Sequence, residues 1–196
     1  IFTASCDNIP APAMLTAADN CGTATVAMME TTVAGDCPGS YTLTRKWTAT
    51  DLCGNTAEHT QVVTVTDTQA PVFAGTLPAA EVAASCDNIP AAATLTATDA
   101  CGSATVTFSE TRTDGACAGS YTLTRKWTAT DKCGNATIVK QIIQVQDVTA
   151  PVFSGVPASV KVSCPNVPTV LNPVVLDICD ATPTLTFKEE KIAGSC

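Results

Sequence analysis

Eleven cysteines recur along this chain of 196 residues at nearly constant spacing, and thiol chemistry is the most specific chemistry that the sequence offers. The first set is Cys6, Cys21, Cys37 and Cys53. A second set, Cys86, Cys101, Cys117 and Cys133, follows at the same spacings, and a third, Cys164, Cys179 and Cys196, follows at nearly the same spacings. The pattern lacks clustered zinc or iron–sulfur ligands, because no pair has C-x-x-C spacing and His59 is the one histidine. The cysteines therefore favour disulfides and an oxidising compartment.

The cysteine sets belong to an internal repeat of 80 residues. The phrase SYTLTRKWTATD occurs at 40–51 and again at 120–131. Such self-similarity predicts a tandem array of one structural unit. We expect three repeats, at 1–69, 70–149 and 150–196, of which only the second is whole. Because both ends fall inside a repeat, we expect a segment of a longer protein, with the next cysteine near about position 212.

The elements that must position these cysteines read as β-strands. Between Tyr121 and Ala129 the residues alternate, so that Tyr121, Leu123, Arg125, Trp127 and Ala129 share one face. The stretches 104–112 and 138–146 alternate in the same way and are separated by Gly, Asp, Asn and Pro. No stretch shows an amphipathic helical repeat. The pattern predicts an all-β fold of tandem immunoglobulin-like antiparallel β-sandwiches.

That topology leads to a prediction for the disulfides. If a first strand covers 72–85 and later strands alternate in direction, Cys101 and Cys133 lie at one end of the sandwich and Cys86 and Cys117 at the other. We therefore predict bonds within each repeat: Cys101–Cys133, Cys86–Cys117, Cys21–Cys53, Cys6–Cys37 and Cys164–Cys196, with Cys179 unpaired. Pairing of sequence neighbours, Cys86 with Cys101 and Cys117 with Cys133, stays open as an alternative. A bridge closing a loop of about 31 residues stabilises by roughly 3–4 kcal/mol.

Acidic residues set the charge of the chain and offer a second kind of site. The net charge of −8 disfavours nucleic acid as a partner. Asp99 and Asp131 precede cysteines by two positions, and Asp67 and Asp147 precede the linkers between repeats. Their carboxylates could hold Ca²⁺ at the joints between domains. The alternative is that each aspartate caps its own turn. We expect no other cofactor.

Catalysis is poorly supported by the sequence. His59 is the one histidine, and valine replaces it at the equivalent position, Val139. A nucleophile needs a positioned base, so we expect no enzyme activity and a surface position for His59. The linkers, 67–71 and 147–151, are short and end in proline, which predicts semi-rigid joints and a rod of domains in line.

Two motifs carry a family resemblance. The junction at 147–153 (DVTAPVF), followed by VSCP at 162–165, resembles the hyalin-repeat (HYR) family, and so does W-T-A-T-D-x-C-G-N at 47–55 and 127–135. The resemblance implies an immunoglobulin-like fold, tandem arrays in extracellular proteins and no catalytic residues. The four-cysteine version resembles repeats of giant surface proteins of Bacteroidota, including gliding-motility adhesins. This implies type 9 secretion, display on the outer membrane and contact with the secretion or motility machinery.

Two classes of function follow. In the first, the repeats form a stalk that holds an adhesive tip away from the cell and contact mainly neighbouring repeats of the same chain. In the second, each repeat binds a glycan or another surface. The expected core positions of Trp47, Trp127, Tyr41 and Tyr121 disfavour the second, because glycan sites present exposed aromatic rings. A role as an accessory module of an exported enzyme is a third alternative.

Overall fold

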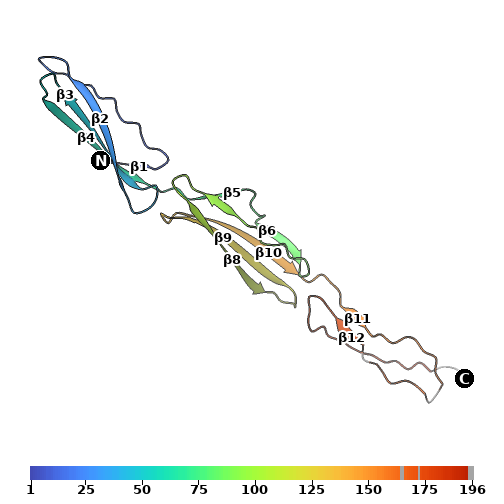
Figure 1. Ribbon diagram of the computed structural model, residues 1–196. Coiled ribbons are helices and arrows are strands. Elements are labelled where there is room, and N and C mark those ends of the chain that lie inside the picture. The colour runs from blue at the N-terminus through green and yellow to red at the C-terminus, as the bar shows by residue number, and fades with distance from the viewer. Residues whose placement is uncertain (164–165, 172, 194–196) are drawn as a thin grey trace. The chain divides into compact units, whose positions relative to one another are not determined.

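The computed structural model describes residues 1–163, 166–171 and 173–193 (Figure 1). All of its named elements are β-strands: β1 (Phe2–Ser5), β2 (Thr25–Ala34), β3 (Tyr41–Thr50), β4 (Thr56–Thr66), β5 (Val72–Ala74), β6 (Glu81–Ser85), β7 (Thr96–Thr98), β8 (Ala104–Asp114), β9 (Tyr121–Asp131), β10 (Ala136–Gln146), β11 (Val152–Ser154) and β12 (Val174–Leu176). The described residues contain no helix long and apolar enough to cross a membrane. The predicted all-β class of tandem immunoglobulin-like repeats is confirmed.

The first two repeats build the same four-stranded sheet. Its order is β1-β4-β3-β2 in the first repeat and β6-β10-β9-β8 in the second. β3 pairs antiparallel with β2 and β4, and the register places Trp47 between Met28 and His59. The first strand of each sheet instead runs parallel to the last, with Val63 opposite Phe2 and Ile143 opposite Val82. Each sheet therefore contains one parallel pairing that the antiparallel prediction lacked.

Smaller sheets complete the described structure. β5 pairs antiparallel with β7, and β11 pairs antiparallel with β12 at the equivalent place in the third repeat. The expected continuous first strand over 72–85 is wrong, because it divides into β5 and β6. The break contains Gly75, which has a φ of +84°, and Pro78, which has no N–H to donate to a ladder.

The chain divides into two compact units. One comprises Ile1–Pro78, Ala93–Ser109 and Lys126–Val139, and the other comprises Ala79–Ala92, Glu110–Arg125 and Lys140–Cys196. The contacts between the first and second repeats described below lie inside the first unit. Those between the second and third repeats lie inside the second unit.

The alternation read from the sequence describes the core correctly. In β9 the residues Leu123, Arg125, Trp127, Ala129 and Asp131 are buried and their neighbours are less so. Valine, isoleucine and leucine side chains from neighbouring strands pack on the same face, in equivalent clusters: Leu43, Val63 and Val65 in the first repeat, and Leu123, Ile143 and Val145 in the second. Apolar burial on one face of each sheet is the main stabilisation of such units.

A tryptophan in each repeat, and an arginine in the first, fix the irregular segment to its sheet. The indole N–H of Trp47 donates to the carbonyl of Ala13 (3.1 Å), and Trp127 donates to Ala93 (2.9 Å). The guanidinium of Arg45 is 3% exposed and donates to the carboxylate of Glu30 (2.8 Å) and to the carbonyl of Pro10 (2.7 Å). A tryptophan that is both buried and hydrogen-bonded gives the segment a defined position.

Candidate functional site: the disulfide-linked junction

The disulfides of the described residues connect successive repeats rather than closing loops inside one repeat. Cys6 bonds to Cys101 with Cα atoms 5.8 Å apart, and Cys37 bonds to Cys133 at 5.3 Å. Both Cα separations lie in the usual range for disulfides. Thus the first cysteine of one repeat joins the second of the next, and the third joins the fourth.

This pairing corrects the sequence prediction. The bonds Cys6–Cys37, Cys101–Cys133 and Cys86–Cys117 are wrong, as is an unpaired Cys179, which bonds to Cys86 with Cα atoms 5.9 Å apart. The reason is that the two cysteine loops at one end of a repeat meet two cysteine loops of the next repeat. The sulfur atoms of Cys6 and Cys37 therefore find their partners across the first junction. The alternative pairing of sequence neighbours is wrong for the same reason.

The first repeat contributes Cys6 and Cys37 to the junction, on loops at the end of its sheet. Cys6 follows β1 directly, and its N–H donates to the carbonyl of Thr66 at the end of β4 (3.2 Å). Cys37 lies in the turn between β2 and β3, where the N–H of Ser40 donates to the Cys37 carbonyl (3.0 Å). The Ser40 hydroxyl also accepts the N–H of Asp67 (3.2 Å). The turn and the start of the linker are therefore tied together.

The second repeat contributes Cys101 and Cys133 to the junction, in turns that are capped by aspartates. Asp99 Oδ1 accepts the N–H of Cys101 (2.8 Å), and Asp131 Oδ1 accepts the N–H of Cys133 (2.8 Å). Asn135 donates its side-chain amide to Asp131 Oδ2 (2.8 Å) and also reaches the carbonyl of Asp67 in the first repeat (3.3 Å). The capping role that the sequence offered as the alternative is therefore confirmed for Asp99 and Asp131.

A glycine permits the close approach of the two repeats. Gly39 has a φ of +85°, and a Cβ built on it would lie 2.8 Å from both the Cβ and the carbonyl oxygen of Cys101. A side chain at this position is thus excluded by the backbone of the next repeat. Sequence reasoning missed this residue, although Gly and Ser recur together after the third cysteine, at Gly39-Ser40 and Gly119-Ser120.

The second junction repeats this design independently. A Cβ on Gly119 would lie 2.7 Å from the Cβ of Cys179, the equivalent of Cys101. The Ser120 hydroxyl accepts the N–H of Asp147 (3.3 Å), as Ser40 does for Asp67. The same close contact therefore accompanies the same bond, Cys86–Cys179, one repeat later.

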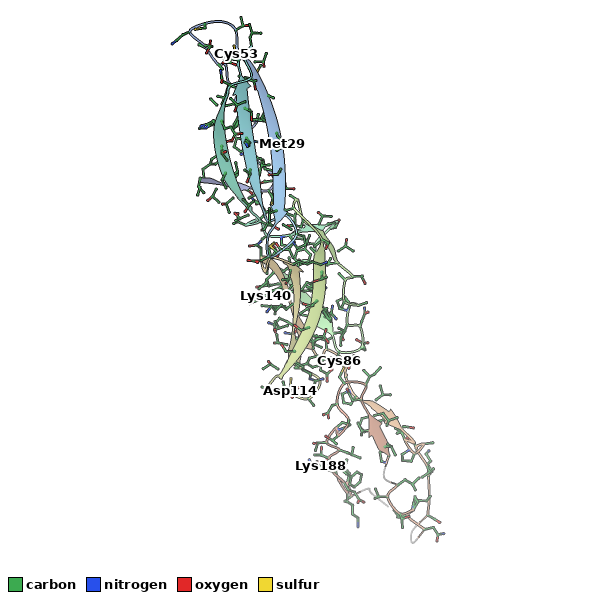
Figure 2. All side chains as sticks on the ribbon, turned by 60° about the vertical axis from the view of Figure 1, so that its left-hand side comes forward. Met29, Cys53, Cys86, Asp114, Lys140 and Lys188 are labelled. Atoms are coloured by element: carbon green, nitrogen blue, oxygen red, sulfur yellow. A yellow bond between two sulfur atoms is a disulfide. The ribbon has the colours of Figure 1, made fainter. Side chains whose placement is uncertain are left out.

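Three cysteines of the described residues are free and exposed: Cys21, Cys53 and Cys117. Cys53 lies in the loop after β3 (Figure 2). The predicted bond Cys21–Cys53 is therefore not formed. The predicted bond Cys164–Cys196 lies outside the described residues.

Three of the four aspartates named as calcium ligands come together. Carboxylate oxygens of Asp67, Asp99 and Asp131 all lie within 4.8 Å of one another. Asp67 and Asp131 are each 8% exposed, and Asp99 Oδ2 is fully buried with no hydrogen-bond partner. Three carboxylates in a buried site repel one another unless a cation or a proton joins them.

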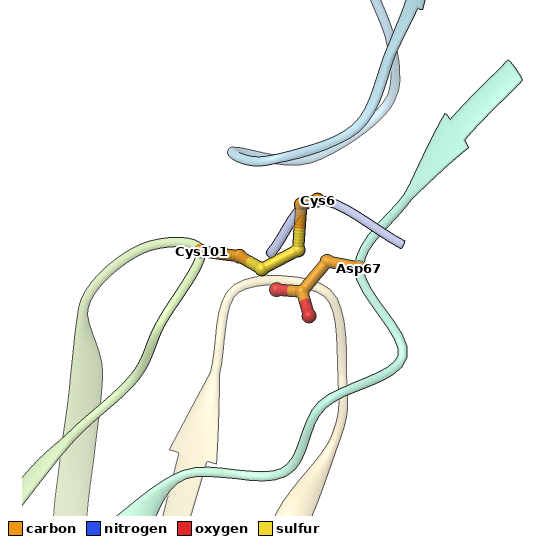
Figure 3. A group of neighbouring side chains, drawn as sticks. All are labelled: Cys6, Asp67 and Cys101. Carbon is orange, nitrogen blue, oxygen red and sulfur yellow. A yellow bond between two sulfur atoms is a disulfide. The ribbon is translucent and has the colours of Figure 1, made fainter. Parts of the chain in front are cut away.

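Asp147 takes the place of Asp67 at the second junction. Asp67 lies against the Cys6–Cys101 bond, and Figure 3 shows its carboxylate beside the two sulfur atoms. Asp147 lies in the same way beside Cys86 and Cys179. Since these sulfur atoms are bonded to each other, they are not thiolate ligands for a metal ion.

Hydrogen bonds lower the pKa of two aspartates in the cysteine turns, Asp51 and Asp131. At Asp51 the side-chain amide of Asn55 is the main cause, with backbone N–H groups of the same turn adding to it. At Asp131 burial raises the pKa, but the hydrogen bonds from Asn135 and from the backbone of Cys133 and Gly134 together lower it below its usual value. Both carboxylates are therefore ionised at neutral pH.

His59 lies on the exposed part of β4, as expected, with its ring centroid 5.9 Å from that of Trp47. The tryptophans are buried, Trp47 at 5% and Trp127 at 1% exposure, and Tyr41 and Tyr121 are partly buried. The expected core positions of the tryptophans are confirmed.

Comparison with known proteins agrees with this architecture. A family model described as "HYR-like domain with 4 cysteines" matches residues 3–65 and again residues 76–145. No curated protein shows a significant match. The disulfides and the domain type together indicate an extracellular protein. Because the two matches cover most of the chain and each contains four cysteines, the chain belongs to the family of HYR-like domains with four cysteines.

Proposed function

We propose that this chain is a structural segment of a long cell-surface filament or adhesin, in which the repeats act as a stalk. The observation that supports this role is the pairing of cysteines between successive repeats. Disulfides inside a repeat would stabilise only that repeat, whereas disulfides between repeats resist their separation. The proposed role is non-catalytic.

A finer assignment follows from the resemblance of the repeats. We place the parent protein on a bacterial outer membrane, exported by type 9 secretion and serving adhesion or gliding motility. In this assignment the neighbours of each repeat are its main partners, and the secretion or motility machinery holds one end. A binding role for each repeat is less well supported, because Trp47 and Trp127 are buried.

The arrangement of the bonds gives the stalk role a mechanical test. The covalent route from Cys6 passes to Cys101, returns along the chain to Cys86 and passes to Cys179. At full extension this route spans only about 15 residues, or roughly 50 Å. The peptide backbone from Cys6 to Cys179 would span roughly 600 Å. A pulled filament with these bonds therefore changes length very little.

Single-molecule force spectroscopy on the chain, pulled from its ends, tests this directly. The oxidised chain should lengthen between Cys6 and Cys179 by no more than roughly 50 Å, and dithiothreitol should restore the full roughly 600 Å. The paired variant Cys86→Ser/Cys179→Ser should give an intermediate value of roughly 270 Å, because 78 residues then enter the route. Equal extension of the oxidised and reduced chains would rule out the stalk mechanism.

A further inference from the structure

The free cysteines of the first repeat lie on a face that is covered in the second repeat. Cys21 and Cys53 are the equivalents of Cys101 and Cys133, which bond to the first and third cysteines of the repeat before them. We infer that Cys21 and Cys53 form a docking face for another four-cysteine repeat, which joins it through its own first and third cysteines. This inference rests on the proposed stalk role and names the partner of the face that carries Cys21 and Cys53.

The face is already built in the first repeat. Asp51 Oδ1 accepts the N–H of Cys53 (2.9 Å), and Asn55 donates to Asp51 Oδ2 (2.7 Å), as their equivalents do around Cys133. Gly54 and Gly134 have φ values of +86° and +93°. The turn that receives a cysteine thus has the same conformation whether or not a partner is present.

Burial distinguishes the two copies of this face. Cys53 and Asn55 are exposed, whereas Cys133 and Asn135 are partly buried at the junction. Asn135 reaches the carbonyl of Asp67 in the preceding repeat, whereas no such partner is described for Asn55 within the described residues. The first repeat therefore presents a preformed but uncovered face at Cys21 and Cys53. In the second repeat the equivalent face, at Cys101 and Cys133, is covered by the repeat before it.

The occupant must present a complementary end. In the first junction that end consists of Cys6, the turn Cys37–Ser40 and a glycine that lets the next backbone approach. The partner is accordingly a repeat with a cysteine after its first strand and a C-x-G-S turn. Each new bond removes two electrons and two protons from two thiols, and a disulfide such as oxidised glutathione accepts them to become two thiols.

Alkylation of the chain under non-reducing conditions gives the first part of the test. With iodoacetamide, Cys21, Cys53 and Cys117 should be labelled, and Cys6, Cys37, Cys101 and Cys133 should stay unlabelled. A second chain carries an additional copy of residues 1–80 in front of residue 1. The first and third cysteines of this added copy then lie next to the original first repeat. After refolding with oxidised and reduced glutathione, the original Cys21 and Cys53 should be protected by at least tenfold. Peptide mapping should show them bonded to the first and third cysteines of the added copy.

Two results separate the possible failures. If Cys6–Cys101 and Cys37–Cys133 form but the original Cys21 and Cys53 stay reactive, or bond to each other, the docking inference is wrong and the stalk role stands. If Cys6–Cys101 and Cys37–Cys133 do not form in either chain, the inference and the stalk role both fail.

Discussion

Gly39 of the first repeat and Cys101 of the second approach so closely that a single added carbon atom would be 2.8 Å from the Cys101 Cβ. The contact recurs between Gly119 and Cys179, and in both places it stands beside a disulfide that joins two repeats. In each of these two junctions, therefore, a close backbone contact and a disulfide occur side by side.

Gly39→Ala should weaken the junction. The positive φ alone costs about 1–2 kcal/mol for a residue with a Cβ, and the collision with Cys101 adds to that. We expect slower oxidation of Cys6 and Cys101, measured by alkylation during refolding. Gly54→Ala is the control, because Gly54 has nearly the same φ (+86°) and nothing within 4 Å of its added Cβ. Equal oxidation rates in the two variants would contradict a role for close approach.

Loss of one cross-link should cost more than loss of a free thiol. A disulfide that closes a loop of about 100 residues is worth up to roughly 5 kcal/mol in the chain-entropy model. Because Cys37–Cys133 constrains much of the same chain, we expect Cys6→Ser/Cys101→Ser to lower the free energy of unfolding by about 2–4 kcal/mol. Cys21→Ser should change it by less than about 0.5 kcal/mol. Urea unfolding followed by tryptophan fluorescence measures both, and similar losses would refute the assignment.

Replacing the buried Arg125 should lower the stability of the fold more than replacing the exposed Arg112. Arg125 is 4% exposed and donates to Glu110 (2.6 Å) and Gln141 (3.4 Å). Arg125→Met leaves these acceptors without a donor, and we expect a loss of about 2–3 kcal/mol, as for hydrogen bonds to charged groups. Arg112→Met removes an exposed ion pair with Asp114 and should cost less than about 1 kcal/mol. Thermal unfolding of the two variants would show the difference, and equal melting temperatures would contradict it.

Acid should destabilise the cysteine turns. The pKa values of Asp51 and Asp131 are lowered in the folded state, so the unfolded chain binds protons first as the pH falls. Their contribution is complete above the unfolded pKa of about 4 and is lost as the pH falls through the folded pKa. Asn55→Ala and Asn135→Ala remove the side-chain donors and should reduce this acid-dependent loss. Unfolding measured from pH 7 to pH 2 tests this, and an unchanged pH profile in both variants would count against it.

The sequence predicted the strands and the core more accurately than the bonds. Alternation from Tyr121 to Ala129 identified the buried face, and the repeat placed Cys101 and Cys133 at the same end. The pairing was wrong because a periodic sequence looks the same whether a cysteine bonds within its repeat or to the next one. Only the positions of the loops in space distinguish the two.

The candidate site was predictable in part. Asp67, Asp99 and Asp131 were expected to meet, and the structure brings them within 4.8 Å. The contact of Gly39 with Cys101 could not be predicted, because it depends on how two repeats meet. The break between β5 and β6 had a visible signal, since Gly75 and Pro78 lie inside the strand that was expected to be continuous.

The overlap of Cys6–Cys101 with Cys86–Cys179 has a consequence for survival outside the cell. A protease that cuts one peptide bond anywhere between Cys6 and Cys179 leaves two fragments that at least one of these disulfides still holds together. A single cleavage of the backbone therefore does not release either fragment. A surface protein built from such repeats would keep its distal end attached after damage that would release the end of an ordinary tandem array.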